Sequence, residues 1–219
     1  YSLHGIATTG LSFGSASDFK YLHDNTDQSY SISCWVYRTA VDVAQTLVDT
    51  CNFTSGGHGV SFSIEANNKV FFQINKGSGG NAVAATGSNE TIPLNKWTHI
   101  SVLHNGTITS GNNVVSMYIN GVEVTYSTRT YNHTNSSNNS STSLHVGIRS
   151  SANLGFTGYI ADLAIMKNVT SSNSVAQSSK ITSSTHADID FLLSVDSIGF
   201  KDSSSSPKTV TTVSTPSIE

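Results

Sequence analysis

The sequence predicts an all-β fold in which short antiparallel strands form two sheets packed face to face. Apolar and polar residues alternate over short runs, which are separated by Gly, Asn and Ser. This pattern is typical of strands with one buried face. No long window has the 3.6-residue period of an amphipathic helix. Many short strands joined by turns indicate a two-sheet sandwich.

The clearest single element is a hairpin around Asn120-Gly121. These two residues tolerate positive φ and suit a type I′ turn, and apolar residues alternate both before and after them. A second hairpin is expected between 60–65 and 69–75, where apolar side chains would oppose one another. One short helix is expected within 169–180. The strands expected from the alternation are 30–37, 60–65, 69–75, 97–104, 114–119, 122–126, 143–149 and 156–166.

Both tryptophans lie inside expected strands, Trp35 in 30–37 and Trp97 in 97–104. We therefore interpret them as core residues rather than as parts of a site. On the alternation, one face of the first of these strands has Ile32, Cys34 and Val36, and the other has Trp35 and Tyr37.

The two cysteines, Cys34 and Cys51, are too few to define a disulfide scaffold or a zinc site. If 31–38 and 45–53 form a hairpin, Cys34 lies opposite Cys51, and facing residues of antiparallel strands are close enough for a disulfide. The alternative is two buried thiols that act as small hydrophobic side chains. Both interpretations stay open at this point.

Charged residues are scarce. They make up 11% of the chain, against about 25% in typical domains, and Ser, Thr and Asn take their place. Such surfaces are common in fibres, adhesins and secreted binding modules, and their hydroxyls and amides pair readily with sugars; the simpler explanation is strands with a polar outer face. The net charge is −3 and the 11 Lys and Arg are scattered, so we expect no nucleic-acid partner. No apolar stretch is long enough for a membrane span.

Five motifs occur in order along the chain, namely Leu11-Ser12-Phe13-Gly14, Ser31-Ile32-Ser33-Cys34-Trp35-Val36, Asn95-Lys96-Trp97-Thr98-His99-Ile100, Met117-Tyr118-Ile119-Asn120-Gly121 and Gly155-Phe156-Thr157-Gly158-Tyr159-Ile160-Ala161-Asp162-Leu163-Ala164-Ile165. Together they resemble the laminin-G-like, concanavalin-A-like jelly-roll family. The resemblance covers residues 11–180 and implies a two-sheet antiparallel jelly-roll sandwich. It implies less about function, because this fold hosts lectins, adhesion modules, enzymes and virion parts.

The C-terminal segment carries further strand-like runs between residues 190 and 211. They look like the leading strands of the same type of domain in multi-domain phage and marine viral structural proteins, although here they come last, as in an offset or permuted repeat. We therefore divide the chain into a sandwich body, 1–187, and C-terminal strands, 188–219. These strands either complete the same sandwich, which we favour, or pair with a neighbouring module or subunit.

Catalytic motifs are missing from the sequence. Endo-glucanases on this fold need closely spaced carboxylates as acid and nucleophile, and none of the four glutamates has a carboxylate within a few positions on the same strand face. The sequence also lacks a Gly-x-Ser-x-Gly elbow and a His-Glu-x-x-His motif. We therefore do not expect an enzyme. The four glutamates are Glu65, Glu90, Glu123 and Glu219.

Calcium is the cofactor that the resemblance implies, because many relatives hold one at the rim of the sandwich. Asp18 and Asp162 are the nearest counterparts of the family's acidic positions, but both of the family's acidic pairs are incomplete here. The alternative, which we favour, gives Asp18 a turn-capping role and Asp162 a bond to the backbone.

Sugar binding would need a stacking aromatic ring beside amide and hydroxyl groups on an exposed loop. Tyr131, Asn132 and His133 meet that description at the start of a segment that is nearly all Asn, Ser and Thr. His58, which follows two glycines, is a further candidate. The alternative for each is an ordinary surface loop.

Taken together, the sequence predicts a non-catalytic jelly-roll module on the surface of a virion, in a fibre or a capsid decoration, with a structural role and a role in adhesion to host glycans. Its expected partners are glycans and neighbouring copies or modules, and its expected location is extracellular or on the virion surface. The alternative is a calcium-dependent lectin or adhesin module of a cell-surface protein.

Overall fold

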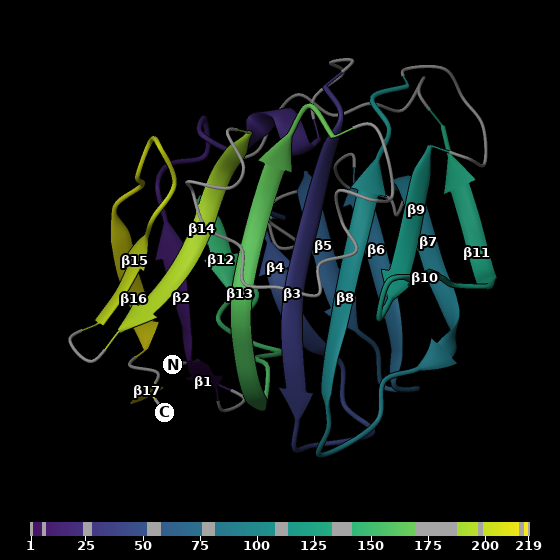
Figure 1. Ribbon diagram of the computed structural model, residues 1–219, viewed down its shortest axis with the longest axis horizontal. Helices are drawn as coiled ribbons and strands as arrows, with labels where there is room; N and C mark the ends of the chain where they lie inside the picture. Colours follow the sequence, from purple (N-terminus) through teal and green to yellow (C-terminus); the bar gives the residue numbers. More distant parts are fainter. Residues whose placement is uncertain are drawn as a thin grey trace.

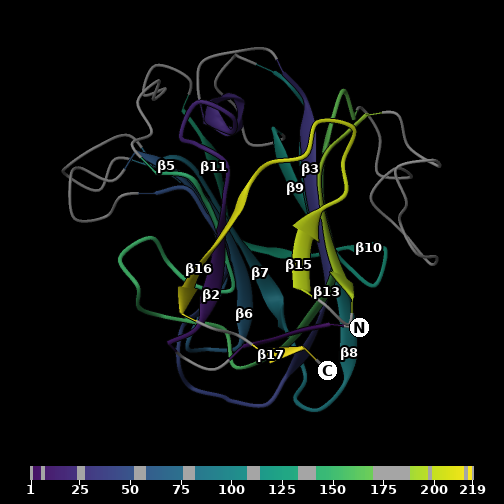
Figure 2. The same ribbon diagram turned by 90° about the vertical axis from the view of Figure 1, so that its left-hand side faces the viewer.

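The computed structural model describes residues 2–5, 8–23, 28–51, 58–75, 82–107, 114–132, 142–169, 188–196, 199–214 and 217–218. Within these ranges the chain forms strands and one short 3-10 helix, η1 (Lys20–Leu22). Two antiparallel sheets pack face to face, as Figures 1 and 2 show from two directions. The predicted antiparallel jelly-roll sandwich is therefore confirmed.

Sheet A has nine strands in the described part of the chain. Their order is β10 (Val122–Glu123), β9 (Val115–Ile119), β8 (Trp97–His104), β3 (Tyr30–Arg38), β13 (Gly158–Lys167), β1 (Leu3–Gly5) and β17 (Ser217–Ile218). Two more strands continue the sheet beside β13, namely β14 (Ile189–Asp196) and β15 (Gly199–Asp202).

Sheet B has eight strands over the same described ranges. Their order is β11 (Tyr126–Tyr131), β7 (Ala82–Thr91), β6 (Lys69–Asn75), β5 (Gly59–Ile64), β4 (Gln45–Asp49), β12 (Leu144–Val146), β2 (Gly10–Phe13) and β16 (Val210–Ser214).

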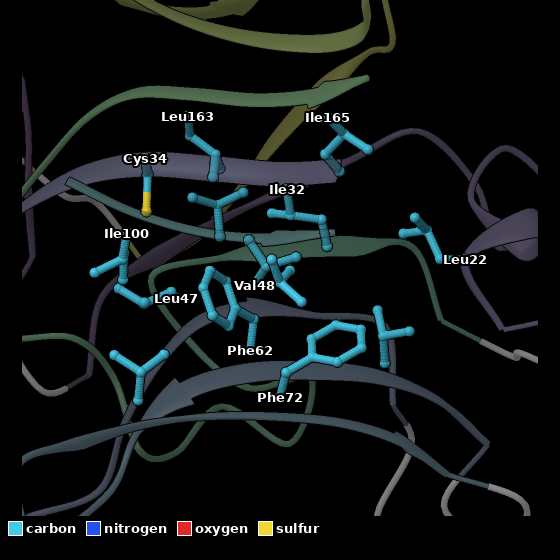
Figure 3. Packing of buried hydrophobic residues seen from close by; sticks show 14 of the residues in the cluster. Leu22, Ile32, Cys34, Leu47, Val48, Phe62, Phe72, Ile100, Leu163 and Ile165 are labelled. Carbon is cyan, nitrogen blue, oxygen red and sulfur yellow. The ribbon is translucent and has the colours of Figure 1, made fainter. Parts of the chain in front are cut away.

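The core lies between the two sheets, and Figure 3 shows part of it. Ile32 and Cys34 of β3 point inward from sheet A and meet Phe62 and Phe72 from sheet B, and all four side chains are fully buried. The alternation placed Ile32 and Cys34 on the same face of this strand, and the structure shows that this face, not the one with Trp35, is buried.

Both predicted hairpins are present. In the first, Phe62 of β5 faces Phe72 of β6. In the second, Asn120 and Gly121 have φ values of 51° and 79°, as a type I′ turn requires. The strand after this turn is shorter than predicted, because β10 ends at Glu123 and the chain crosses to sheet B as β11. The helix expected within 169–180 falls, apart from Val169, outside the described residues.

The predicted pairing of the two cysteine-containing strands is wrong. β3 pairs with β8 and β13 in sheet A, whereas β4, just before Cys51, pairs with β5 and β12 in sheet B. The connection between β3 and β4 therefore crosses from one sheet to the other. Cys34 and Cys51 are both free and buried, and the amide of Asn75 donates to Sγ of Cys51 at 3.5 Å.

β13 has β3 along one edge and two different strands along the other. It pairs first with β1, where Ile160 faces Leu3, and further along with β14, where Ala164 faces Leu192. The change falls at Asp162, which has a φ of 49° and lies where the register with β3 shifts, as in a β-bulge. The C-terminal strands thus pair with strands of the body, and β16 pairs with β2 in the same way. The boundary drawn at residue 187 lies outside the described residues and stays a prediction.

Gly158 begins β13 with a φ of 135° and lies so close to β3 that an added Cβ would be 2.1 Å from the carbonyl oxygen of Tyr37. We expect Gly158→Ala to lower the free energy of unfolding by about 2–4 kcal/mol, because the strand must move away from β3. Urea denaturation would measure the loss. Gly199→Ala is the control, since Gly199 also has a positive φ, 157°, but nothing lies within 4 Å of its added Cβ. Equal losses in the two variants would contradict the proposed clash.

Candidate functional site

Four aromatic side chains stand in one row across the outer face of sheet A. Trp97 of β8 faces Tyr37 of β3, Tyr37 faces Tyr159 of β13, and Tyr159 faces His4 of β1. Facing residues of antiparallel strands point to the same side of the sheet. The row therefore lies on one surface, at the lower end of β8 and β3 in Figure 1.

The rings of Trp97, Tyr37 and Tyr159 pack against one another. The ring centroids of Trp97 and Tyr37 are 5.7 Å apart, those of Tyr37 and Tyr159 are 5.8 Å apart, and those of Trp97 and Tyr159 are 6.4 Å apart. The planes are inclined by 49° to 72°, which is a favourable packing geometry for aromatic pairs. Tyr159 in turn stacks on His4 at 4.6 Å. The outermost ring, that of Trp97, keeps 40% of its surface exposed.

A cleft of about 480 Å³ opens beside these rings, and we call it the aromatic cleft. Hydroxyl and amide groups share its walls with the aromatic rings, a combination that suits a small polar ligand with an apolar face. Its lining residues are Ser2, Tyr37, Thr39, Asn95, Trp97 and Tyr159.

Arg38 holds one wall of the aromatic cleft in place. It is fully buried, and its guanidinium donates to the carbonyl oxygen of Ile92 at 2.9 Å, to that of Ala40 at 3.0 Å and to Oδ1 of Asn68 at 2.7 Å. The backbone N–H of Asn95 donates to the carbonyl oxygen of Arg38 at 2.9 Å. These bonds tie the segment that ends at Asn95 to the end of β3.

The structure corrects the assignment of both tryptophans to the core. Trp97 is exposed and Trp35 is half-buried on the outer face of β3. The physical reason is strand parity, because Ile100 and Val102 of β8 point into the core, so residues at odd positions of that strand point outward. Sequence reasoning missed the aromatic cleft for this reason, although the parity signal was present.

Of the residues predicted to bind sugar, Tyr131, Asn132 and His58 lie at the other end of the sandwich. Tyr131 ends β11 and is half-buried. The centroid of its ring lies 5.5 Å from that of His104, at the opposite end of β8 from Trp97, and burial raises the pKa of its phenol. Asn132 follows β11, His133 lies outside the described residues, and His58 precedes β5. Tyr131, Asn132 and His58 do not line the aromatic cleft, and the role of all four residues in sugar binding stays a prediction.

The two predicted calcium ligands lie in different settings. Oδ2 of Asp18 accepts from the backbone N–H of Ser15 at 2.7 Å and from its hydroxyl at 2.9 Å, and these bonds lower the pKa of the carboxyl. Asp162 lies at the bulge of β13. Among the described residues, no group of three or more His, Cys, Asp and Glu side chains is placed to hold a metal ion. Calcium binding stays a prediction.

A larger hollow of about 690 Å³ lies where β2, β13 and β14 end or begin, and two lysines and two aspartates line it. The ammonium of Lys167 lies 2.9 Å from Oδ1 of Asp190, and that of Lys208 lies 3.4 Å from the same atom. The hydroxyl of Tyr21 donates to Oδ2 of Asp190 at 2.8 Å. Because both ammonium groups already contact Asp190, we interpret this cluster as a structural link between the C-terminal strands and the body.

Buried histidines make the fold sensitive to acid. Burial lowers the pKa of His23, His99 and His104 to about 4 each. Their unfolded value is about 6.5, so the unfolded chain binds more protons between these values, and stability is lost as the pH falls from about 6.5 towards 4. Asp49 acts in the opposite direction, because burial raises its pKa to about 7 and its contribution to stability is lost as the pH rises.

Three histidines outweigh one aspartate, so we expect the melting temperature to fall by at least ~5 °C between pH 7 and pH 4.5. Scanning calorimetry across this range would measure the fall. The matched variant is His23→Leu, because His23 is buried and neither of its ring nitrogens has a hydrogen-bond partner among the residues that the structure describes. The melting temperature of His23→Leu should fall less over this pH range. If it fell as much as that of the unmodified chain, buried His23 would not contribute to the sensitivity to acid.

Comparisons with known proteins agree with the two-sheet sandwich. The family described as the concanavalin A-like lectin/glucanases superfamily matches residues 12–176. The chain belongs to this superfamily. No curated protein matches the chain in sequence. Among the described residues, no helix is long and apolar enough to cross a membrane.

Several solved structures share the fold. A proposed carbohydrate-binding protein of Bacteroides ovatus is similar over 99% of this chain, with 10% identity and a TM-score of 0.63, and this chain spans 62% of its length. The CBM40 of the Ruminococcus gnavus IT-sialidase is similar over 80% of this chain and 96% of its own length, with 11% identity and a TM-score of 0.52. A pentraxin of Limulus polyphemus is similar over 80% of this chain and 78% of its own length, with 12% identity and a TM-score of 0.53. At these identities the similarity shows the fold alone.

Proposed function

We propose that this chain is a non-catalytic glycan-binding module and that the aromatic cleft is its binding site. The observation that carries the proposal is the exposed ring of Trp97 beside the amide of Asn95 and the hydroxyls of Ser2 and Thr39. A sugar ring has one face of C–H groups and a rim of hydroxyls. An aromatic face beside hydrogen-bonding groups matches both parts.

Sugar binding by proteins of the same fold supports the proposal. The CBM40 of the Ruminococcus gnavus IT-sialidase has been solved with α2,3-sialyllactose and with α2,6-sialyllactose, and both structures are similar to this chain over 80% of its length. The fold therefore accommodates glycans. The similarity does not say where a glycan would lie on this chain, and for that the proposal depends on the aromatic cleft.

A non-catalytic role fits the chemistry of the cleft. Glycoside hydrolysis uses two carboxyl groups on either side of the scissile bond. Of the described residues, the six that line the aromatic cleft include no carboxyl group. The arrangement suits retention of a sugar.

Within this function, we place the module on the surface of a virion, in a fibre or a capsid decoration. The low charge of 11% and the order of the C-terminal strands support this context. The alternative is a calcium-dependent lectin or adhesin module of a cell-surface protein. Light scattering on the purified chain separates the two, since a virion part should form symmetric oligomers and a lectin module should bind sugar as a monomer.

A glycan array probed with the chain, first with calcium and then with a chelator, tests the function. We expect binding that survives chelation and that changes the tryptophan fluorescence on titration with the best glycan. The fluorescence change should disappear in Trp97→Phe, which leaves Trp35 as the remaining tryptophan. Binding lost on chelation would favour the calcium-dependent lectin, and no binding in either condition, with a control lectin active on the same array, would contradict glycan binding.

A further inference from the structure

We infer that the aromatic cleft selects uncharged sugar residues and discriminates against sialylated, uronic-acid and sulfated glycans. This inference rests on the proposed function and names the class of ligand for the same site. It depends on which charged groups face the cleft and on where the nearest cations lie.

The lining of the cleft is uncharged. Its six residues are Ser, Thr, Asn, Trp and two Tyr, and none of these types is ionised at neutral pH. An anionic sugar that entered the cleft would lose water from its carboxylate or sulfate and gain no charged partner. Such a transfer is costly, whereas neutral hydroxyls exchange bonds with water for bonds with the lining hydroxyls and amide at little net cost.

Arg38 is one of two cations next to the lining in sequence, since it lies between Tyr37 and Thr39. Its guanidinium points the other way, into the protein, where it is fully buried and donates to Ile92, Ala40 and Asn68. Recognition of a carboxylate commonly uses the two parallel N–H groups of an arginine. Here the guanidinium is fully buried, and both of its terminal nitrogens donate to protein oxygens on the inner side of β3, so it does not reach a ligand in the cleft.

Lys96 is the remaining cation next to the cleft in sequence, between Asn95 and Trp97. Its side chain is exposed and is not part of the cleft lining. An ammonium in water contributes little to binding of a single anion. Because Lys96 lies between two lining residues, it is the cation to change in a test of anion recognition at this site.

The ring geometry further limits the ligand to a short element. Trp97, Tyr37 and Tyr159 lie within 6.4 Å of one another and are inclined rather than coplanar. They leave no room for a sugar between them and form no flat platform for a polymer surface. Trp97 is the exposed ring, so one sugar ring stacks there while the polar lining contacts its hydroxyls.

Matched glycan pairs test the inference. The affinities of lactose-type glycans and of their sialylated forms would be measured by calorimetry at pH 7.5 for the unmodified chain, Lys96→Gln and Trp97→Ala. We expect each neutral glycan to bind at least ~10-fold more tightly than its sialylated form, a ratio that corresponds to about 1.4 kcal/mol. Lys96→Gln should leave this ratio unchanged.

The outcomes separate the inference from the function. Tighter binding of the sialylated forms, lost in Trp97→Ala, would keep the aromatic cleft as a glycan site and overturn the selection of neutral sugars. If the sialylated forms bound more tightly and this preference were lost in Lys96→Gln, Lys96 would be the residue that binds the anion. That result would also overturn the selection of neutral sugars. Binding unaffected by Trp97→Ala would overturn the site itself, and with it the inference.

Discussion

Replacing Trp97 with alanine is expected to weaken glycan binding by ~30-fold or more, while the melting temperature falls by only ~5 °C, since two aromatic contacts are lost. Central aromatic side chains in binding sites contribute about 2 kcal/mol or more when truncated, and 2 kcal/mol corresponds to ~30-fold in affinity. The fold should tolerate the change because the ring is 40% exposed and outside the core. Calorimetric titration with the best array glycan would measure the affinity, and thermal denaturation would measure the stability.

Two further variants make this result specific. Trp97→Phe keeps an aromatic face and should lose less affinity than Trp97→Ala. Tyr131→Ala removes the aromatic side chain that the sequence pointed to, at the far end of the sandwich, and should leave the affinity unchanged. If Tyr131→Ala abolished binding and Trp97→Ala did not, the site would lie on the loops beyond β11 and the aromatic cleft would be ruled out.

Replacing Arg38 with methionine is expected to lower the free energy of unfolding by about 3–5 kcal/mol. Methionine fills much of the same space but donates no hydrogen bond. The carbonyl oxygen of Ile92 and Oδ1 of Asn68 would lose the donor that Arg38 supplies, whereas the carbonyl oxygen of Ala40 keeps the amide of Gln45 at 3.1 Å. A buried acceptor left without a donor costs about 1–3 kcal/mol. For a chain of this size the melting temperature should fall by ~10 °C. Urea denaturation and scanning calorimetry would measure the two quantities.

Arg129→Met is the matched control. The guanidinium of Arg129 also donates to a carbonyl oxygen, that of Val115 at 2.8 Å, and to the hydroxyl of Ser116 at 2.6 Å. It lies on β11 at the edge of sheet B and keeps 19% of its side-chain surface exposed, so water can replace the lost bonds. We expect a loss of about 1 kcal/mol. Equal losses in the two variants would show that burial of Arg38 does not decide its contribution.

The sequence was sufficient to predict the class of fold and which residues share a face of a strand. Ile32, Cys34 and Val36 share one face of β3 as the alternation predicts, and that face is buried, because one face of a strand in a sandwich must leave water. Which strands pair with one another was harder to predict from the sequence. An alternating run shows which face is buried but not which sheet it joins, so 31–38 and 45–53 fitted a hairpin as well as a connection between sheets. In the structure, the chain crosses from sheet A to sheet B between these two strands.

The site was harder to predict because its residues are far apart in sequence. Ser2, Tyr37, Trp97 and Tyr159 come from different segments, and only the order of β8, β3, β13 and β1 in sheet A brings them together. Sequence reasoning looked for aromatic residues in loops and so selected Tyr131, whose ring packs against His104. The outward position of Trp97 could have been predicted, because Trp97 and Ile100 lie an odd number of residues apart on one strand and therefore point to opposite faces.

The short pair of β1 and β17 determines how this molecule would respond to mechanical tension. Leu3 faces Ile218 and His4 faces Ser217, and the two ends of the chain lie side by side in both views (Figures 1 and 2). A force that pulls the ends apart loads these few hydrogen bonds one after another, as in unzipping, before it reaches the long strands. The next contact to receive the load is the stack of His4 on Tyr159, and Tyr159 lines the aromatic cleft. Tension on the chain would therefore reach the aromatic cleft before it reaches the long strands.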